Sequence, residues 1–213
     1  MLEIEYRGGN CWTLNTKKAK FVFDADRNYT GLKEISDKDA VQFATEQGLL
    51  ANRDNFRLSF AGDGEYEIAD VEINGFAVAR HIDDPRDGKK NSTIYNILAD
   101  GVRIGLLGNI AGYLSEKELE SLGVVDILLL PVGGGGYTLD GVSASKLIAK
   151  IEPKIIVPLH FAEKGLNYEV PQAPLSDFLQ EVKATVVEEK KLKIKSPSDI
   201  PPVMQIRHLE LAV

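Results

Sequence analysis

The stretch Asp126-Ile127-Leu128-Leu129-Leu130-Pro131-Val132-Gly133-Gly134-Gly135 indicates the fold more clearly than any other part of the chain. A nearly continuous apolar run, ended by a proline and a glycine tract, is typical of a strand that is buried on both faces. A helix is predicted before it at about 115–122, where Ser115 and Glu118 form a capping-box pattern. A second helix is predicted at 140–151 and another strand at 154–158. This alternation predicts a layered α/β arrangement.

The first part of the chain reads instead as short strands, at 2–6, 11–14 and 20–24, whose brief polar connections imply antiparallel pairing. Asn74-Gly75 and Asp100-Gly101 lie between apolar runs and predict tight hairpins. A third helix is expected at 175–183, a solvated hairpin at 188–195 and a last strand at 204–211. We therefore expect one domain over residues 1–213, a four-layer αββα sandwich of two mixed sheets with helices on the outer faces.

Composition narrows the class of partner. The 213-residue chain has a net charge of -7 with acidic and basic residues interspersed, which argues against a nucleic-acid surface. No apolar run approaches membrane-spanning length and the first residues do not resemble a signal peptide. Cys11 is the single cysteine, which fits a reducing compartment. We expect a cytoplasmic protein that binds a small molecule or a protein partner, and assembly into a homo-oligomer stays open.

Several further motifs occur in a fixed order along the chain and carry a resemblance. They are Gly64-Glu65-Tyr66-Glu67-Ile68, His81, Gly108-Asn109, the Pro131 to Gly135 tract followed by Tyr137-Thr138-Leu139-Asp140, and Ile156-Val157-Pro158-Leu159-His160. In this order they resemble the metallo-β-lactamase fold. The resemblance is strongest to its branch of predicted zinc-dependent hydrolases, which includes the ascorbate-6-phosphate lactonase-like enzymes.

The resemblance fails where such proteins hold metal. Their central motif, His-x-His-x-Asp-His, follows an apolar strand, but here the corresponding segment is Thr45-Glu46-Gln47-Gly48-Leu49-Leu50, without a histidine. The expected bridging aspartate is Asn109, and an amide cannot bridge two cations as a carboxylate does. Only His81 and His160 match family ligands, whereas catalytic zinc needs about three protein ligands and an open position. We therefore expect no cofactor.

Five residues form the predicted ligand-binding cleft: His81, Asn109, Gly133, Gly134 and His160. His81 is either a residual ligand or acid/base group, or a polar loop residue. His160 is expected to face the cleft, and Asn109 either bonds one of the histidines or is a turn residue. The glycines either cradle an anion or form a tight turn that lets another strand pass close by.

Other residues receive supporting roles. Asp24 is expected beneath the site, Asp140 at the start of the helix that follows it, and Cys11 as a small buried apolar residue.

The preferred hypothesis is a hydrolase-like protein that has lost metal-dependent activity and acts by binding a ligand or a protein. The alternative is a hydrolase of esters, lactones or phosphoesters with a rebuilt site for one zinc or manganese ion. That site would use His81, His160 and a carboxylate from Asp83, Asp84 or Asp24. A third hypothesis is metal-free acid/base catalysis by one of the two histidines.

Overall fold

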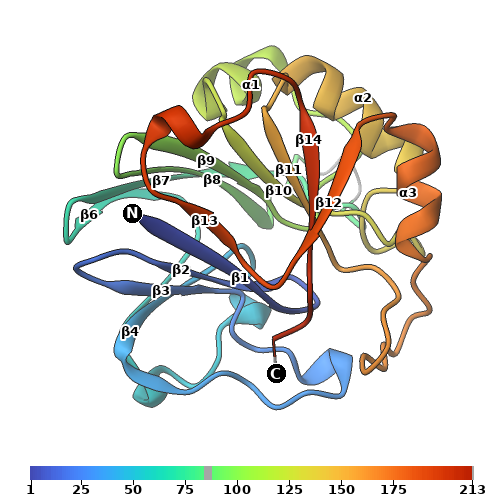
Figure 1. Cartoon of the computed structure of the whole chain (residues 1–213). Coiled ribbons are helices and arrows are strands. Elements are labelled where there is room, and N and C mark those ends of the chain that lie inside the picture. The colour runs from blue at the N-terminus through green and yellow to red at the C-terminus, as the bar shows by residue number, and fades with distance from the viewer. Residues whose placement is uncertain (84–87, 213) are drawn as a thin grey trace.

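Two mixed sheets face each other in the computed structural model, which describes residues 1–83 and 88–212 (Figure 1). The six-stranded sheet has the order β13-β1-β2-β3-β4-β5, with β1 (Leu2–Gly8), β2 (Cys11–Asn15), β3 (Lys20–Phe23), β4 (Asp37–Ala44), β5 (Phe56–Ala61) and β13 (Leu192–Ile194). The eight-stranded sheet has the order β12-β14-β11-β10-β9-β8-β7-β6, with β6 (Gly64–Ile68), β7 (Val71–Val78), β8 (Ser92–Ala99), β9 (Val102–Leu107), β10 (Ile127–Pro131), β11 (Ile155–Leu159), β12 (Thr185–Glu189) and β14 (Gln205–Leu209).

Strand directions follow the lengths of the connections. Short turns join β1, β2 and β3 as antiparallel neighbours, as the sequence predicts. The buried run quoted above forms β10, which pairs in parallel with β9 on one side and β11 on the other. Every residue of β10 and β11 is buried, because a parallel strand at the centre of a sheet is covered on both faces.

Helices cover the outer face of the eight-stranded sheet (Figure 1). They are α1 (Glu116–Leu122), α2 (Gly141–Ile151) and α3 (Leu175–Glu181). Ser115 and Glu118 form the predicted capping box of α1, and the Asp140 side chain accepts a hydrogen bond from the Ser143 amide at the start of α2. None of the described helices is both long enough and apolar enough to cross a membrane.

The expected α/β fold with two mixed sheets is confirmed. Helices were expected on both outer faces, but loops cover the outer face of the six-stranded sheet. The connecting segments there contain only short 3₁₀ turns, η1 (Asn28–Thr30), η2 (Gln47–Leu49) and η3 (Arg53–Asn55). A small apolar cluster packs beneath them: Cys11, Val22, Ala25, Ile35, Ala40, Ala51 and Phe56. Most of these side chains are small, so close-lying loops bury them without a helix. A fourth short turn, η4 (Pro197–Asp199), precedes β14.

Two local expectations are wrong. Asn74-Gly75 lies inside β7 rather than in a turn, and the chain reverses at Ala69-Asp70 between β6 and β7. Gly75 is needed for packing, since a Cβ there would lie 2.8 Å from the Tyr95 ring. The segment 188–195 is not a hairpin either, because β12 pairs with β14 in one sheet and β13 with β1 in the other.

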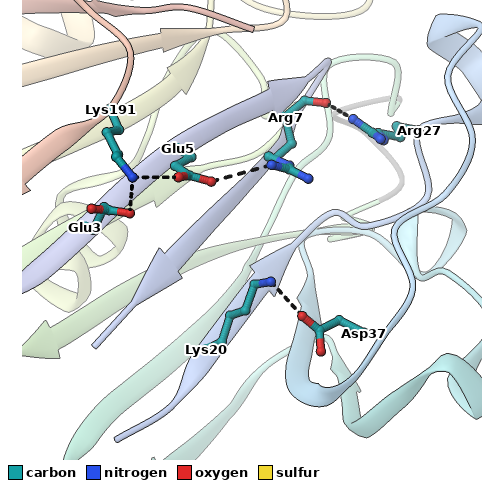
Figure 2. Close-up of polar contacts among 7 residues, drawn as sticks. All are labelled: Glu3, Glu5, Arg7, Lys20, Arg27, Asp37 and Lys191. Carbon is teal, nitrogen blue, oxygen red and sulfur yellow. Dashed lines mark hydrogen bonds and ion pairs between the residues drawn. The ribbon is translucent and has the colours of Figure 1, made fainter. Parts of the chain in front are cut away.

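Charged side chains line the outward face of β1, as Figure 2 shows. Lys191 Nζ lies 2.8 Å from Glu3 Oε1 and 3.4 Å from Glu5 Oε1, and Arg7 Nη1 lies 3.5 Å from Glu5 Oε2. Arg27 donates to the main-chain oxygen of Arg7. These ion pairs are partly buried and lie on the side of β1 that faces away from the core.

Candidate functional site

A cavity of about 240 Å³ opens where strands of both sheets end. Four of its polar side chains come directly after strands: Glu46 after β4, Arg80 after β7, Asn109 after β9 and His160 after β11. Ligand sites of open α/β sheets lie at such carboxyl ends of strands. The remaining lining residues are Tyr29, Gly48, Leu49, Ile82, Tyr137, Tyr168, Glu169, Val170 and Gln172.

The structure brings together only part of the predicted cleft. Asn109 and His160 line the cavity. His81 is exposed and is not among the lining residues, although its main-chain N–H donates to the Asn109 oxygen at 3.0 Å. Its neighbours Arg80 and Ile82 line the cavity instead. The chain forms a turn here, in which the Asp83 main-chain N–H donates to the Arg80 main-chain oxygen at 3.0 Å. Asp84 lies outside the described residues.

Gly133 and Gly134 do not line the cavity, and Gly133 has a packing role. A Cβ at Gly133 would lie 2.2 Å from the His160 main-chain oxygen and 2.5 Å from Gln172 Oε1. The tight-turn interpretation of the glycine tract therefore describes Gly133, because only a residue without a side chain lets the His160 backbone approach so closely.

A continuous row of hydrogen bonds links the polar residues of the cavity. Arg80 Nη1 donates to Glu46 Oε2 at 3.1 Å, and Asn109 Nδ2 donates to Glu46 Oε1 at 3.0 Å. Asn10 Nδ2 donates to Asn109 Oδ1 at 2.9 Å, and His160 Nδ1 lies 2.6 Å from Asn10 Oδ1. We call these five residues the polar row. It spans both sheets and satisfies polar groups that burial would otherwise leave unpaired.

His160 is held firmly within this row. Its side chain is 3% exposed, its main-chain N–H donates to the Gly9 oxygen at 2.9 Å, and its φ of +51° is in the left-handed region. Its imidazole centroid lies 4.8 Å from the Tyr168 ring, with planes 12° apart, and 5.5 Å from the Tyr29 ring. Burial lowers the pKa of His160 to about 3, so the imidazole is neutral at physiological pH.

Arg80, Glu46 and Glu169 are charged residues that line the cavity. Burial raises the pKa of Glu46, while the hydrogen bonds and charge of Arg80 and the amide of Asn109 oppose that rise. Arg80 Nη2 also contacts Asp83 Oδ1 at 3.1 Å, so two carboxylates hold one guanidinium. Neither Glu46 nor Arg80 was a candidate from sequence. The available signal was the position of Glu46 in the segment that replaces the histidine motif.

Asp24 is fully buried and holds Thr45, the residue before Glu46. One carboxylate oxygen accepts from the Thr45 amide at 2.7 Å and the other from the Thr45 hydroxyl at 2.9 Å. Burial raises the pKa of Asp24 to about 8, against the opposing effect of the Thr45 hydrogen bonds. Asp24 thus fixes the turn that places Glu46.

Comparison with known proteins settles the family. The sequence profile described as a beta-lactamase superfamily domain matches residues 3–160. The chain belongs to the beta-lactamase superfamily. A UPF0173 metal-dependent hydrolase of Thermococcus onnurineus is 26% identical over 133 residues, covering 62% of this chain and 57% of the relative. Another, from Archaeoglobus fulgidus, is 32% identical over 85 residues, or 40% of this chain and 35% of the relative.

This superfamily member therefore matches less than two thirds of the length of these curated relatives, 57% of one and 35% of the other. Solved structures agree with the fold over the whole chain. A metallo-beta-lactamase superfamily protein of Thermotoga maritima has a TM-score of 0.73 at 19% identity, covering 98% of this chain and 99% of its own. Igni18, a metallo hydrolase of Ignicoccus hospitalis, has a TM-score of 0.63 at 15% identity, covering 100% and 96%. These likenesses show the fold.

The names of these relatives imply a metal ion, but the side chains of this superfamily member are engaged in other contacts. Both oxygens of Glu46 accept hydrogen bonds, and the amide oxygen of Asn109 faces Asn10. The Arg80 guanidinium lies beside Glu46 and would repel a divalent cation there. Within 1–83 and 88–212, no three side chains of His, Cys, Asp or Glu gather so as to hold a metal ion. These donors do not fit the zinc site that the superfamily implies.

Proposed function

We propose that this protein binds a small organic molecule in the cavity, without a metal ion, and that it has no metal-dependent hydrolase activity. The observation that carries the proposal is the polar row. Its hydrogen bonds engage the side-chain oxygens of Glu46, Asn109 and Asn10, and Arg80 supplies the positive charge beside them. A guanidinium held by carboxylates can supply the positive charge of a buried site in place of a metal ion.

The chemistry of His160 also favours binding over acid/base catalysis. An effective general base has a pKa near the working pH, whereas burial lowers the pKa of His160 to about 3. Its Nδ1 is already engaged by Asn10. Cys11 is fully buried and burial raises its pKa to about 12, so it is a poor nucleophile. We find no activated nucleophile among the described residues that line the cavity.

Finer assignments belong to the proposal as well. Within the superfamily we place the chain beside the predicted zinc-dependent hydrolases that include the ascorbate-6-phosphate lactonase-like enzymes, on the motifs quoted from the sequence. The names of the curated relatives as metal-dependent hydrolases support that placement. A single domain, a cytoplasmic location, a protein partner and assembly into a homo-oligomer stay predictions.

The test is metal binding measured on protein purified without a metal-binding tag. Elemental analysis and calorimetric titration with zinc and manganese should give well under one ion per chain. The matched variant Arg80→Met, Asn109→Asp removes the guanidinium and restores a carboxylate, so it should bind metal more tightly than the wild type. Stoichiometric metal in the wild type that His160→Ala abolishes would overturn the proposal. So would hydrolysis of esters, lactones or phosphoesters that disappears on chelation and returns with zinc.

A further inference from the structure

Glu46 determines which group donates and which accepts in each hydrogen bond of the polar row. A carboxylate only accepts hydrogen bonds, so Asn109 must turn its NH₂ group toward Glu46 and its oxygen toward Asn10. Asn10 must then turn its NH₂ group toward Asn109, which leaves its own oxygen facing His160. The proton on the imidazole therefore sits on Nδ1, 2.6 Å from that oxygen.

The other nitrogen of the ring, Nε2, is consequently a hydrogen-bond acceptor. Among the residues that the structure describes, the polar atom bonded to the buried ring is a neutral amide oxygen, so no anion among them compensates a positive charge on the ring. Nε2 has no hydrogen-bond partner among the described side chains. It is also not one of the fully buried polar atoms that lack a partner. His160 lines the cavity, so Nε2 offers a lone pair to a molecule inside it.

Charge in the cavity disfavours an anionic ligand. Arg80 is the only basic side chain among the described lining residues, and Glu46 and Asp83 each hold it at 3.1 Å. Its charge is therefore compensated within the protein. Glu169, which is exposed and also lines the cavity, adds a further negative charge. A phosphoester or a carboxylate would meet net negative potential here, whereas a neutral or cationic molecule would not.

Shape and lining favour a flat molecule. The cavity of about 240 Å³ is large enough for one or two fused rings. Leu49, Ile82 and Val170 supply apolar contacts, and the Tyr168 ring stacks beside His160. Tyr137, 46% exposed, also lines the cavity. Aromatic and aliphatic walls with a few placed polar groups are typical of a small-molecule site.

We propose that the cavity binds a small, flat, uncharged or cationic ring compound that donates an N–H or O–H hydrogen bond to His160 Nε2. This inference rests on the proposed metal-free binding function and names its class of ligand. It excludes the anionic phosphoesters that the hydrolase alternative would include.

The test compares pairs of probes that differ in one property. Indole and benzofuran share a bicyclic frame, but benzofuran has an oxygen where indole has the N–H donor. Leaving the buried acceptor unpaired should weaken benzofuran binding about tenfold or more, measured by NMR titration of the tag-free full chain. Indole-5-carboxylate should likewise bind about tenfold or more weakly than its neutral partner, indole-5-carboxamide.

His160→Phe keeps a ring but removes the acceptor, so it should abolish the preference for indole while benzofuran still binds. Because φ is positive at this residue, the variant can fail to fold. The tautomer in the wild type is therefore measured independently from the ¹⁵N shifts of His160, with Nε2 expected to show the shift of an unprotonated nitrogen.

Equal affinity for indole and benzofuran, no binding of any of the four probes, or a proton on Nε2 would each overturn the ligand class. None of these results would contradict the proposal that the cavity binds no metal ion. Stoichiometric zinc uptake would instead overturn the proposed function itself, so the two failures are distinguishable.

Discussion

Replacing Asp24 by asparagine should make the stability of this protein much less dependent on pH. The folded chain holds the Asp24 carboxyl fully buried against the amide and hydroxyl of Thr45. Asparagine has the same shape as the protonated acid. Its oxygen can accept from the Thr45 amide while its NH₂ group donates to the Thr45 hydroxyl, so Asp24→Asn keeps both contacts.

The size of the effect follows from the pKa of Asp24, which burial raises from 3.8 to about 8 in the folded protein. In the unfolded chain this carboxyl loses its proton near its ordinary pKa. Between these values unfolding releases a proton, so the stabilisation from Asp24 is fully present below pH 3.8 and is lost as pH rises through about 8. The loss is about 1.4 kcal/mol per pH unit, with an upper limit on the order of 6 kcal/mol.

Urea unfolding at pH 5, 6, 7 and 8 measures this directly, provided that the m-values agree. The wild type should lose stability relative to Asp24→Asn at each step of rising pH. The matched control is Asp140→Asn: hydrogen bonds from Ser143 lower the pKa of Asp140, so it is ionised in both states over this range. That variant should differ from the wild type by the same amount at every pH. Parallel curves for wild type and Asp24→Asn would refute the reasoning.

Three further outcomes are expected. Gly133→Ala should destabilise the fold by about 1–3 kcal/mol or more, because its Cβ would lie 2.2 Å from the His160 oxygen; unchanged urea midpoints would contradict this. Leu129→Ala, at a fully buried position of β10, should cost about 2–5 kcal/mol in the same assay. Cys11, fully buried with its pKa raised by burial to about 12, should react with a thiol reagent only as fast as the protein opens, and rapid labelling of the native state would show that it is accessible.

Local pattern was sufficient for much of the fold. The apolar run that forms β10 and the Ser115 capping box depend on neighbours in the sequence, so they could be predicted. Asp100-Gly101 forms the expected tight turn, with both residues at positive φ. Asn74-Gly75 carries the same signal but lies within β7, because the space beside Gly75 is taken by Tyr95 from the next strand. Packing between strands overrode turn propensity there.

Some residues of the candidate site could be predicted from the sequence and others could not. Asn109 and His160 were predicted from the family resemblance, because they stand where the resembled proteins have metal-site residues. The structure places both in the lining of the cavity. Asn10, Glu46, Arg80 and Tyr168 could not be assigned to it, since they come from both sheets and from the segment after β11. No spacing along the chain relates them.

The sequence by itself therefore determined the class of fold, the buried central strands and the absence of the histidine motif, because each depends on residue type and local periodicity. Only the tertiary structure decided that His81 is not among the lining residues of the cavity, that Arg80 lies beside Glu46, and that Asn10 engages His160 Nδ1. The physical reason is that hydrogen-bond direction and charge compensation depend on which groups meet in space, and the pairing of two sheets brings together residues distant in sequence.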